Sequence, residues 1–579
     1  MTDASLRKML DQLFTRAIND ASGSTGFSAH VMPAGRPEFG DYQVNGVMAA
    51  ARQLKTNPRE LAAKVLACLP TQAEISNLEI AGPGFINIQL ADDYLSRQAQ
   101  ALTGSIDGLI PRTDSAQTIV VDYSSPNLAK EMHVGHLRGS IIGDSLVRIL
   151  ARLGHAVIRQ NHVGDWGTQF GMLIAHLEDL GTDEAALPRQ LADLEGFYRA
   201  AKARFDQEPA FAERARACVV KLQSGDASYL AMWRRFIDES LGHCQAIYSR
   251  LQLRLQPDDL CPESFYNNRL AGIVDLLDER GLLSVSEGAR VVFLPEFKGK
   301  DGDALPVIVQ KSDGGYLYST TDLAAVAYRC QELRADRVLY VVDARQSLHF
   351  QQIFAVARVA GLSSSHCVLE HVAYGTMMGK DGKPFKTRSG DTVRLAELLD
   401  EGQRRAFELV TAKNPALSET QRQEIARVVS TGAIKYSDLS KNRNSDYIFD
   451  WDAMLSFEGN TAPYLLYAYT RIQSIFKKQD VIDYSSSKIS TETAQERALL
   501  IKILQLPEVL EQIAEDYLPS HLSSYLYELA GVFMRFYEAC PILKAEAPYR
   551  DSRLALAALT ARTLREGLEL LGLETLEQM

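Results

Sequence analysis

The sequence lacks any run of eighteen apolar residues, the length that a helix needs to cross the apolar core of a bilayer. It also lacks an export signal at its start, because MTDASLRKMLDQLF is amphipathic instead of a basic stretch followed by an apolar one. These absences argue against membrane-inserted and exported proteins. We therefore expect a cytoplasmic protein without a membrane partner.

Cysteine is scarce, with seven in 579 residues, and none forms the closely spaced pairs that bind zinc or build a disulfide framework. This argues against a disulfide-stabilised secreted domain, and it predicts no structural metal site. We expect free thiols, most of them buried. The seven are Cys68, Cys218, Cys244, Cys261, Cys330, Cys367 and Cys540.

Low-complexity and Pro/Gly-rich tracts are also missing, while 46% of the residues are apolar and 23% are charged, as in soluble globular proteins. A chain of 579 residues is too long for one hydrophobic core, so we expect about two to four domains. The net charge of -11 argues against indiscriminate binding to nucleic acid, and we expect no DNA partner. A local basic face can still bind RNA.

Residues 1–110 are predicted to form a small α+β domain. In TNPRELAAKVLACL, Asn57, Pro58 and Glu60 take the positions of a capping box that opens an amphipathic helix. The segment LEIAGPGFINIQL alternates apolar and polar residues around a Gly-Pro-Gly turn, which predicts two strands. We expect no catalytic residue in this domain.

Residues 111–400 alternate between strand and helix patterns, as is typical of an α/β domain. The segment TIVVDYSS predicts a strand, a helix with apolar residues at every third or fourth position follows, and HAVIRQNHVGD predicts the next strand. With the later strands RVLYVVDA and CVLEHVAYG, this pattern predicts a doubly wound parallel sheet, the Rossmann-like nucleotide-binding core. A mostly helical insertion is expected at about residues 175–290.

The rest of the chain has helical periodicity almost throughout. We expect residues 401–458 to form a helical connecting segment and residues 459–579 to form an all-α bundle. The last helix is predicted at RLALAALTARTLREGLELLGLE, whose leucines repeat at helical spacing. The predicted fold class is therefore α/β, with a small N-terminal α+β domain and a C-terminal helical bundle.

Two histidines stand three positions apart in SSPNLAKEMHVGHLRGS, residues 124–140, between a predicted strand and a predicted helix. In a parallel sheet this junction lies at the ligand-binding edge, where a helix N-terminus attracts anions. His133 and His136 can donate hydrogen bonds to phosphate oxygens, and Gly135 lets a ligand approach the backbone. The motif predicts a nucleotide triphosphate site. The alternative is a structural pair, with one histidine capping the helix and the other packed beneath it.

The longer stretch SSPNLAKEMHVGHLRGSIIGD resembles the first signature of class I aminoacyl-tRNA synthetases, and most closely that of the arginyl-tRNA synthetase family. Further segments resemble the bacterial form of the family over nearly the whole chain. They are EFGDYQVNGVMAAARQL, NHVGDWGTQFG, ESFYN, YLYSTTDLAA and the C-terminal helical region. The resemblance implies ATP-dependent ligation of L-arginine to its cognate tRNA through an arginyl-adenylate, with release of AMP and pyrophosphate.

The resemblance also implies which residues bind free arginine. A guanidinium requires carboxylates, because its donors form a planar fork and its charge cannot be titrated away. We expect Asp322 to bind the guanidinium, Tyr318 to orient it and Asp122 to add a second negative charge. Asn127 and Gln346 complete the pocket, and which of Asp122, Asn127 and Gln346 holds the α-amino group stays open. A helix N-cap is the alternative role of Asp322, and packing is that of Tyr318.

The second class I signature, KMSKS, is not plainly present. The corresponding segment MMGKDGKPFKTRSGD is basic, but the second lysine of the signature is missing. The resemblance implies that Lys130, just before the histidines, compensates for it. We expect Lys130, Lys380 and Lys386 to act on the triphosphate with the histidines, and which of them replaces the missing lysine stays open. The basic residues of the segment are Lys380, Lys383, Lys386 and Arg388. A solvated surface loop is the alternative.

ATP is expected to arrive with Mg²⁺, and the family likeness implies that arginine activation requires bound tRNA. The C-terminal region resembles the anticodon-binding domain shared by arginyl and cysteinyl enzymes. There, Tyr464 and Arg471, with Tyr467 and Tyr469 beside them, are expected to contact anticodon bases. A tyrosine row at helical spacing is more often part of a core. The N-terminal domain is implied to touch the outer corner of the tRNA, and the protein to be a monomer.

Other functions fit the sequence less well. Small nucleotidyl transferases with an HxGH motif are far shorter and lack a helical RNA-binding region. A cysteinyl enzyme needs a zinc-bound thiol site, for which the chain has no cysteine cluster. A non-catalytic tRNA-binding protein has no physical reason to keep all five of His133, His136, Asn127, Asp322 and Gln346.

Overall fold

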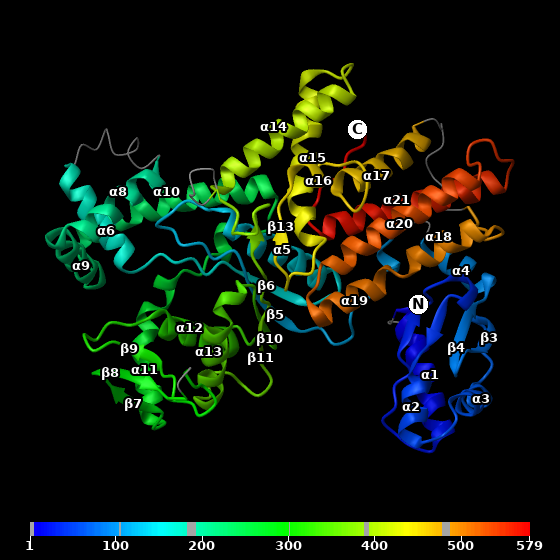
Figure 1. The fold of residues 1–579 in the computed structure, drawn as a ribbon, viewed down its shortest axis with the longest axis horizontal. Helices are drawn as coiled ribbons and strands as arrows, with labels where there is room; N and C mark the ends of the chain where they lie inside the picture. Colours follow the sequence, from blue (N-terminus) through cyan, green and yellow to red (C-terminus); the bar gives the residue numbers. More distant parts are fainter. Residues whose placement is uncertain (1–4, 103–105, 182–192, 300–301, 387–392, 478–486) are drawn as a thin grey trace. The chain divides into compact units, whose positions relative to one another are not determined.

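The computed structural model describes residues 5–102, 106–181, 193–299, 302–386, 393–477 and 487–579. The chain divides into two compact units, whose elements are labelled in Figure 1. The catalytic-core unit comprises Ala116–Ala151 and His155–Met454. The terminal unit comprises Met1–Ser115, Arg152–Gly154 and Leu455–Met579.

A parallel sheet of four strands, in the order β11-β10-β5-β6, lies in the catalytic-core unit (Figure 1). Its strands are β5 Thr118–Asp122, β6 Ala156–Gln160, β10 Arg337–Tyr340 and β11 Val368–His371. Helix α5 (Leu137–Arg152) connects β5 to β6, and α13 (Ser347–Val359) connects β10 to β11. The inner strands β5 and β10 are almost wholly buried, as expected for parallel strands that are covered on both faces. The predicted Rossmann-like sheet is confirmed.

Helix α12 (Tyr318–Ala327) is held against this sheet by one apolar cluster. Leu323 of α12, Val338 of β10 and Ile353 of α13 are all fully buried in it. Burying this face fixes the orientation of α12, and its first two turns carry the predicted arginine ligands Tyr318 and Asp322.

The insertion is helical as far as α11, in agreement with the sequence pattern. Its helices are α6 Thr168–Leu180, α8 Leu194–Gln207, α9 Pro209–Gln223, α10 Ala227–Leu251 and α11 Leu270–Glu279. A short strand begins just before the expected end of this mostly helical insertion at about residue 290. An antiparallel sheet starts there, made of β7 Leu283–Ser286, β8 Ala289–Val292 and β9 Val307–Gln310. Glu287 and Gly288, with φ of 50° and 78°, form the two-residue turn between β7 and β8.

The chain after the sheet begins with two long helices, α14 Leu395–Lys413 and α15 Glu419–Leu439. The short helix α16 (Trp451–Met454) follows. Helix was expected here, but the structure adds a short strand, β13 (Tyr447–Ile448), which pairs in parallel with β12 (Met377–Met378).

The N-terminal part of the terminal unit is an α+β fold, as predicted. Its sheet has the order β1-β2-β4-β3. The elements are α1 Leu6–Ser22, β1 Val31–Pro33, β2 Tyr42–Val44, α2 Gly46–Leu54, α3 Pro58–Cys68, β3 Ile75–Ala81, β4 Phe85–Leu90 and α4 Asp92–Leu102. Asn57 caps α3 but accepts from the N–H of Arg59, not from that of Glu60, so the expected capping box is wrong. The short asparagine side chain reaches the nearer N–H group.

The C-terminal part of the terminal unit is helical, as predicted. Its helices are α17 Ala462–Phe476, α18 Ala494–Leu504, α19 Leu506–Asp516, α20 Ser520–Ala539 and α21 Tyr549–Leu570. Along α21, Leu556, Leu559, Leu564 and Leu568 are fully buried, which accounts for the leucine repeat seen in the sequence.

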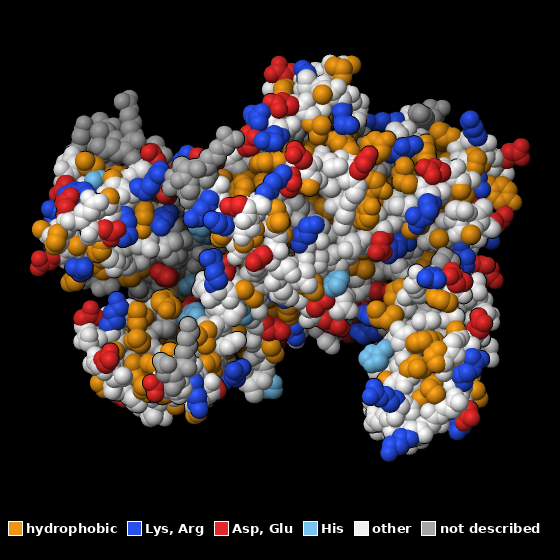
Figure 2. Space-filling model, viewed as in Figure 1, with side chains coloured by type: hydrophobic (Ala, Val, Ile, Leu, Met, Phe, Trp, Pro, Cys, Tyr) orange, Lys and Arg blue, Asp and Glu red, His pale blue; other side chains and the backbone are white. Residues whose placement is uncertain are grey.

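The surface is mixed in charge, since Lys and Arg side chains alternate with Asp and Glu side chains across the face shown in Figure 2. Within the described ranges, no helix is long and apolar enough to cross a membrane. All seven cysteines are free thiols, as predicted; Cys68 is exposed and the other six are buried.

Candidate active site

The predicted site residues lie at the carboxyl ends of the parallel strands. Asp122 is the last residue of β5, and the loop after it carries Asn127 and the histidine motif. Gln346 ends the short helix η7 (Ala344–Gln346), which follows β10. Ligands bind at this edge in sheets of this kind, because the strand order leaves a crevice there.

The histidine pair caps a short helix in a reciprocal way. The N–H of Gly135 donates to Nδ1 of His133, and the N–H of His133 donates to Nδ1 of His136, each at 3.1 Å. The two ring centroids are 4.0 Å apart. Because both Nδ1 atoms accept, the proton of each neutral ring sits on Nε2, which stays available as a donor. The structural and the ligand-binding interpretations of the motif are therefore compatible.

Both histidines are held neutral. Burial lowers the pKa of His136 to about 3, with a further contribution from the neighbouring His133. Burial also lowers the pKa of His133, and the charges of Lys130 and Arg345 act in the same direction. Near neutral pH, this pair can therefore donate hydrogen bonds to an anion but does not carry a proton to it.

Gly135 is required by the histidine ring beside it. A Cβ atom at this position would lie 2.8 Å from Cε1 and 2.9 Å from Nδ1 of His133. A side chain here would displace the ring that caps η3 (Val134–His136), and the expectation that this glycine also makes room for a ligand stays a prediction.

The predicted lysines lie around this motif and on the basic loop after β12. Nζ of Lys130 lies 4.5 Å from the ring centroid of Tyr198 in α8. Lys380 is exposed and pairs with Asp450, with Nζ and Oδ2 2.9 Å apart. Lys386 is exposed, and Arg388 lies outside the described residues.

Backbone hydrogen bonds hold the far end of the basic loop against the histidine motif. The N–H of Val134 donates to the carbonyl of Val393 (3.0 Å), and the N–H of Leu395 donates to the carbonyl of Met132 (2.9 Å). The chain therefore returns from the loop directly onto the strand-like segment that contains His133.

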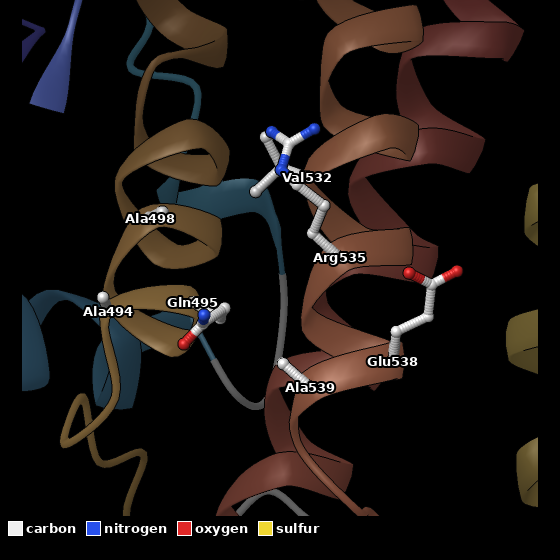
Figure 3. A pocket seen from close by; sticks show the side chains of 7 residues that line it. All are labelled: Ala494, Gln495, Ala498, Val532, Arg535, Glu538 and Ala539. Carbon is white, nitrogen blue, oxygen red and sulfur yellow. The ribbon is translucent and has the colours of Figure 1, made fainter.

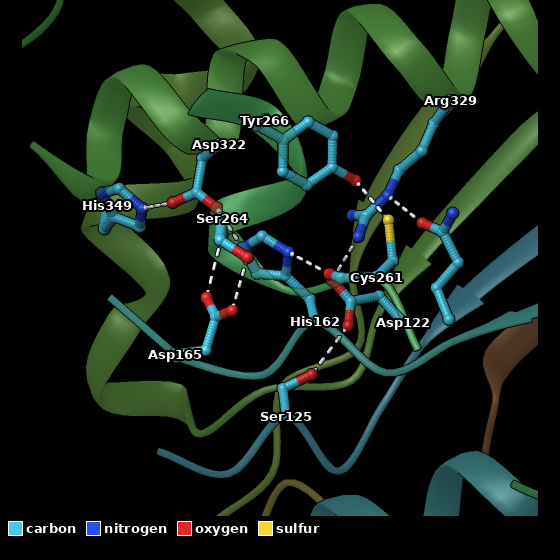
Figure 4. A network of polar contacts seen from close by, with 11 residues as sticks. Asp122, Ser125, His162, Asp165, Cys261, Ser264, Tyr266, Asp322, Arg329 and His349 are labelled. Atoms are coloured by element: carbon cyan, nitrogen blue, oxygen red, sulfur yellow. Dashed lines mark hydrogen bonds and ion pairs between the residues drawn. The ribbon is translucent and has the colours of Figure 1, made fainter. Parts of the chain in front are cut away.

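Asp122 is committed to a buried ion pair (Figure 4). Its Oδ2 lies 2.8 Å from Nη2 of Arg329, which is fully buried, and its Oδ1 accepts from the hydroxyl of Ser125 at 2.8 Å. Arg329 also donates to Gln160 at the end of β6 (2.6 Å). We therefore correct the prediction that Asp122 adds a second negative charge for a ligand, because Arg329 already neutralises it.

Asp322 faces two histidines and no internal Lys or Arg within the described part of the chain. Its Oδ2 lies 2.6 Å from Nε2 of His349, and its Oδ1 lies 3.8 Å from Nε2 of His162 (Figure 4). Nδ1 of His162 is 3.1 Å from the carbonyl oxygen of Cys261. The ring of Tyr318, whose residue is 63% exposed, packs edge-on against His349 with centroids 5.0 Å apart.

Glu263 joins this acidic group and is the residue that the sequence interpretation missed. It opens the short helix η5 (Glu263–Arg269) and corresponds to the first letter of ESFYN. Burial, together with the charges of Asp165 and Asp322, raises the pKa of its carboxyl to about 8. Burial also raises the pKa of Asp165, whose carboxylate accepts from the N–H and hydroxyl of Ser264.

The three carboxylates form an acidic cluster, which we define as Asp165, Glu263 and Asp322. Among the described residues, none of the three pairs with a Lys or Arg side chain. Ionising partly buried carboxyl groups without a counter-ion is costly, as the raised pKa values of Glu263 and Asp165 indicate, so this cluster is suited to a cationic ligand. No sequence pattern links residues this far apart along the chain, and only the fold brings them together.

The other two predicted arginine-binding residues, Asn127 and Gln346, lie on exposed loops. Asn127 is exposed, and its Oδ1 accepts from the N–H of Ala129 (3.1 Å). Gln346 is also exposed and precedes the first residue of α13. Both lie on loops that leave neighbouring strands, β5 and β10.

Three family comparisons cover most of the chain. The family described as tRNA synthetases class I (R), catalytic domain, matches residues 100–451. The Arginyl tRNA synthetase N terminal domain matches residues 8–90, and the DALR anticodon binding domain matches residues 465–579. The chain belongs to the arginyl-tRNA synthetase family.

Relatives with the same architecture extend over the full length. The arginine–tRNA ligase of Hahella chejuensis is 54% identical over 577 residues, covering 99% of this chain and 100% of that protein. The one of Chromobacterium violaceum is 56% identical over 561 residues, covering 96% and 97%. The crystal structure of arginyl-tRNA synthetase from Plasmodium falciparum matches with a TM-score of 0.86 at 30% identity, covering 100% of both chains.

Membership of the arginyl-tRNA synthetase family fixes the class of reaction. The chain is a class I aminoacyl-tRNA synthetase, and its reaction is the ATP-dependent ligation of L-arginine to tRNA. The predicted family, fold class and enzymatic activity are confirmed.

Within the anticodon-binding domain of the family, the predicted tRNA contacts lie on α17. Tyr464 is partly exposed, and the guanidinium of Arg471 lies 4.9 Å from the ring centroid of Tyr537. Arg471 also donates to the hydroxyl of Tyr467 (3.1 Å). Tyr469 is only 2% exposed, so the expectation that it stacks on bases is wrong. Its side chain lies on the face of α17 that packs in the core.

A hollow of about 470 Å³ opens between α18 and α20 in the same domain (Figure 3). It is lined by Ala494, Gln495, Ala498, Val532, Arg535, Glu538 and Ala539. Burial and Tyr527 raise the pKa of Tyr464, whereas the charge of Arg535 opposes them. Arg535, which lines this hollow, therefore interacts electrostatically with Tyr464, one of the predicted tRNA contacts.

Proposed function

We propose that the sheet edge binds its two small substrates at electrically opposite ends, with ATP at the histidine motif and arginine at the acidic cluster. The observation that carries this proposal is the acidic cluster itself. Its carboxyl groups have no Lys or Arg counter-ion among the described residues, and a guanidinium supplies both the charge that favours their ionised form and a planar set of donors.

At the arginine end, the guanidinium binds between Asp322 and Glu263, and the exposed ring of Tyr318 lies beside it. His349 and His162 hold the Asp322 carboxylate in place. Lysine presents a compact ammonium that cannot bond both carboxylates in one plane, and citrulline leaves them without a counter-charge. Either replacement leaves partly desolvated carboxylates poorly paired, so no separate editing step is needed.

Asn127 and Gln346 are proposed to hold the α-amino and α-carboxylate groups of arginine. Both expose side-chain amides at the ends of adjacent strands, and an amide can donate as well as accept. Asp122 acts indirectly, because its ion pair with Arg329 and its bond to Ser125 fix the start of the loop that carries Asn127.

At the ATP end, the Nε2–H groups of His133 and His136 and the N-terminus of α5 are proposed to bind phosphate oxygens. Lys130, Lys380 and Lys386 add positive charge. Mg²⁺ supplies further charge when it is bound with ATP. In the described ranges, no group of three or more His, Cys, Asp or Glu side chains could hold a metal ion, so we propose that the triphosphate carries it.

The proposed reaction has two steps. In the first, the α-carboxylate of arginine attacks the α-phosphorus of ATP, the bond to the β-phosphate oxygen breaks, and pyrophosphate leaves with arginyl-adenylate remaining. In the second, the 2'-hydroxyl of the terminal tRNA adenosine attacks the arginyl carbonyl, loses its proton and releases AMP. The side chains act mainly by positioning and by stabilising charge on the phosphates.

Recognition of tRNA is proposed to involve both ends of the chain. Tyr464 and Arg471 contact bases of the anticodon, which single-stranded loops present for stacking. Residues 1–110 contact the outer corner of the tRNA, residues 111–400 catalyse, residues 401–458 connect and residues 459–579 read the anticodon. We further propose a cytoplasmic monomer that requires bound tRNA for arginine activation.

The decisive experiment is arginine-dependent exchange of labelled pyrophosphate into ATP, with and without arginine tRNA, and with lysine as a control. Exchange with arginine alone among the amino acids, and only in the presence of tRNA, is the expected result. Comparable exchange with lysine would contradict the assignment of the acidic cluster to a guanidinium. No exchange, with tRNA still bound, would leave only a tRNA-binding role.

A further inference from the structure

Arg138 lies two residues after His136 and is buried between α5 and the segment that follows α15. Its Nε lies 3.0 Å from Oδ2 of Asp438, and neither side chain is more than 2% exposed. Its Nη1 donates to the carbonyl of Ser445 (3.0 Å), and its guanidinium lies 5.1 Å from the ring centroid of Tyr447. One side chain beside the histidine motif thus contacts the end of α15, at Asp438, and two residues of the segment that follows it, Ser445 and Tyr447.

That segment holds the first residues of the basic loop. Strand β13 pairs with β12, and the N–H of Tyr447 donates to the carbonyl of Thr376 (3.2 Å). One step further, the N–H of Phe449 donates to the carbonyl of Met378 (2.9 Å). The position of β12, and of Lys380 two residues beyond it, therefore depends on the segment that Arg138 contacts.

The same loop ends on the histidine motif through the backbone bonds of Val134 with Val393 and of Leu395 with Met132. One described end is thus fixed by the residues just before α5, and the other is fixed through the side chain of Arg138 in the first turn of α5. If the contacts of Arg138 are lost, the start of the loop loses its side-chain link to α5 and keeps only contacts such as the bond from the N–H of Ala344 to the carbonyl of Tyr374 (2.9 Å).

We propose that Arg138 and Asp438 are positioning residues for ATP, because their ion pair fixes the root of the basic loop relative to the histidine pair. The inference rests on the proposed roles of His136 and Lys380 at the triphosphate. A fully buried ion pair adds little net stability over apolar residues of similar size, since both charges lose their hydration. The ion pair instead holds Arg138 against Asp438, and the bond that its Nη1 donates fixes the position of the Ser445 carbonyl.

The test measures kcat and the two KM values of aminoacylation, together with the melting temperature, for Arg138→Lys and Asp438→Asn. We expect the KM for ATP to rise about tenfold or more and the KM for arginine to stay within about twofold, because a shift of the loop root misplaces only the triphosphate contacts. The acidic cluster that is proposed to bind arginine has no contact with this pair among those described.

A double variant separates positioning from stability. In Arg138→Met with Asp438→Leu, the burial cost of both charges is gone, so the melting temperature is expected to recover. The bond to Ser445 is lost as well, so the raised KM for ATP is expected to persist. Recovery of both quantities would show that the pair is only structural and would overturn the proposal.

Asp144→Asn is the matched control, because Asp144 is also a buried carboxylate on α5 and pairs with an arginine, Arg148, at 2.7 Å. It is expected to lower the melting temperature without a selective change in the KM for ATP. An equal rise in that KM for Asp144→Asn and Asp438→Asn would overturn the proposal.

The same measurements on Lys380→Ala and His136→Ala test the proposed ATP site separately from the proposed positioning role of Arg138 and Asp438. If these variants leave the KM for ATP and kcat unchanged, the proposed ATP site is wrong. If they change them while Arg138→Lys and Asp438→Asn do not, the site is right and the positioning role is wrong.

Discussion

The candidate active site contains two histidine pairs that differ in what surrounds them. In the first pair, His133 and His136, both Nδ1 atoms accept backbone N–H groups. In the second pair, His162 and His349, the Nε2 atoms approach the carboxylate of Asp322 at 3.8 and 2.6 Å. The same ring therefore serves as a neutral donor in one place and as a support for a carboxylate in the other.

This difference follows from the neighbouring charges. Burial and then the positive charges of Lys130 and Arg345 lower the pKa of His133 in the first pair, whereas the second pair lies beside the carboxylate of Asp322 in the acidic cluster. A positive end suits the phosphates of ATP, and a negative end suits the guanidinium of arginine. Variants at the two ends should therefore affect different substrates, and the predictions below test this separation.

The largest effect is expected for Asp322→Asn. This variant removes one of the charges proposed to pair with the guanidinium, and breaking a largely desolvated ion pair costs about 3 to 5 kcal/mol. We expect kcat/KM for arginine to fall by about 10² to 10⁴-fold. The KM for ATP should stay nearly constant. Steady-state aminoacylation with each substrate varied in turn measures both, and equal losses for the two substrates would contradict separate ends.

His136→Ala should act at the other end and chiefly on kcat. Losing one preorganised donor to a developing negative charge typically costs about 10²-fold in kcat. His136→Gln keeps an N–H donor on a side chain of similar length, so we expect it to recover part of the activity. Single-turnover rates of adenylate formation are the measurement, and an unaffected rate in the alanine variant would contradict the proposed role.

The pKa shift of His136 adds a pH dependence to the same variant. Because its folded-state pKa is lowered to about 3, the neutral ring contributes stability that is complete above its ordinary value of 6.5 and is lost as the pH falls towards 3. Denaturant unfolding of the wild type and of His136→Gln at pH 7 and pH 5 should therefore show a smaller acid-induced loss in the variant. Parallel losses would contradict the burial of a neutral histidine.

The sequence was sufficient to predict the first histidine pair but not the second end of the site. Strand, loop and helix are contiguous around HVGH, so local patterns place His133 and His136 at the sheet edge. Glu263 and Asp322 belong to different elements, η5 and α12, and no local pattern shows that they meet. Periodicity can reveal which face of a helix is buried, but not which distant carboxylate it faces.

For Asp122, the sequence predicts the position of the residue but not its partner. Its place at the end of a buried strand correctly indicated a residue at the ligand edge. Its counter-ion, Arg329, follows α12 in the sequence and is buried under the sheet edge, which no composition or spacing reveals. The hairpin at Glu287 and Gly288 was missed for another reason, because its short strands were included in a region of helical composition.

A smaller effect is expected for proton release on arginine binding. With a pKa of about 8, Glu263 is about 90% protonated at pH 7 in the free enzyme. An arginine guanidinium favours the ionised carboxyl, so binding should release close to one proton. Calorimetric titration in two buffers with different ionisation enthalpies measures this number, which should fall to about 0.1 at pH 9.

Glu263→Gln is the control for that measurement, since the amide cannot release a proton. If the variant binds arginine and still releases a proton, another group is responsible. The same raised pKa has a consequence for stability without ligand: the protonated Glu263 contributes fully below its ordinary value of 4.5, and the contribution is lost as the pH rises through about 8. Unfolding of the free enzyme at pH 6 and pH 9 should therefore differ less in Glu263→Gln.

The smallest effect is expected for Tyr198→Leu, which tests whether the ring of Tyr198 positions the ammonium group of Lys130 at the ATP end. The ring of Tyr198 lies 4.5 Å from Nζ of Lys130, and a partly exposed cation–π contact contributes about 0.5 to 1 kcal/mol. Leucine keeps the apolar packing but removes the face that holds the ammonium, so the KM for ATP should rise about two- to fivefold while the KM for arginine stays constant. Tyr198→Phe keeps the ring and should behave like the wild type. An equal rise in the phenylalanine variant would assign the effect to the hydroxyl group and remove Tyr198 from the electrostatic account of the ATP end.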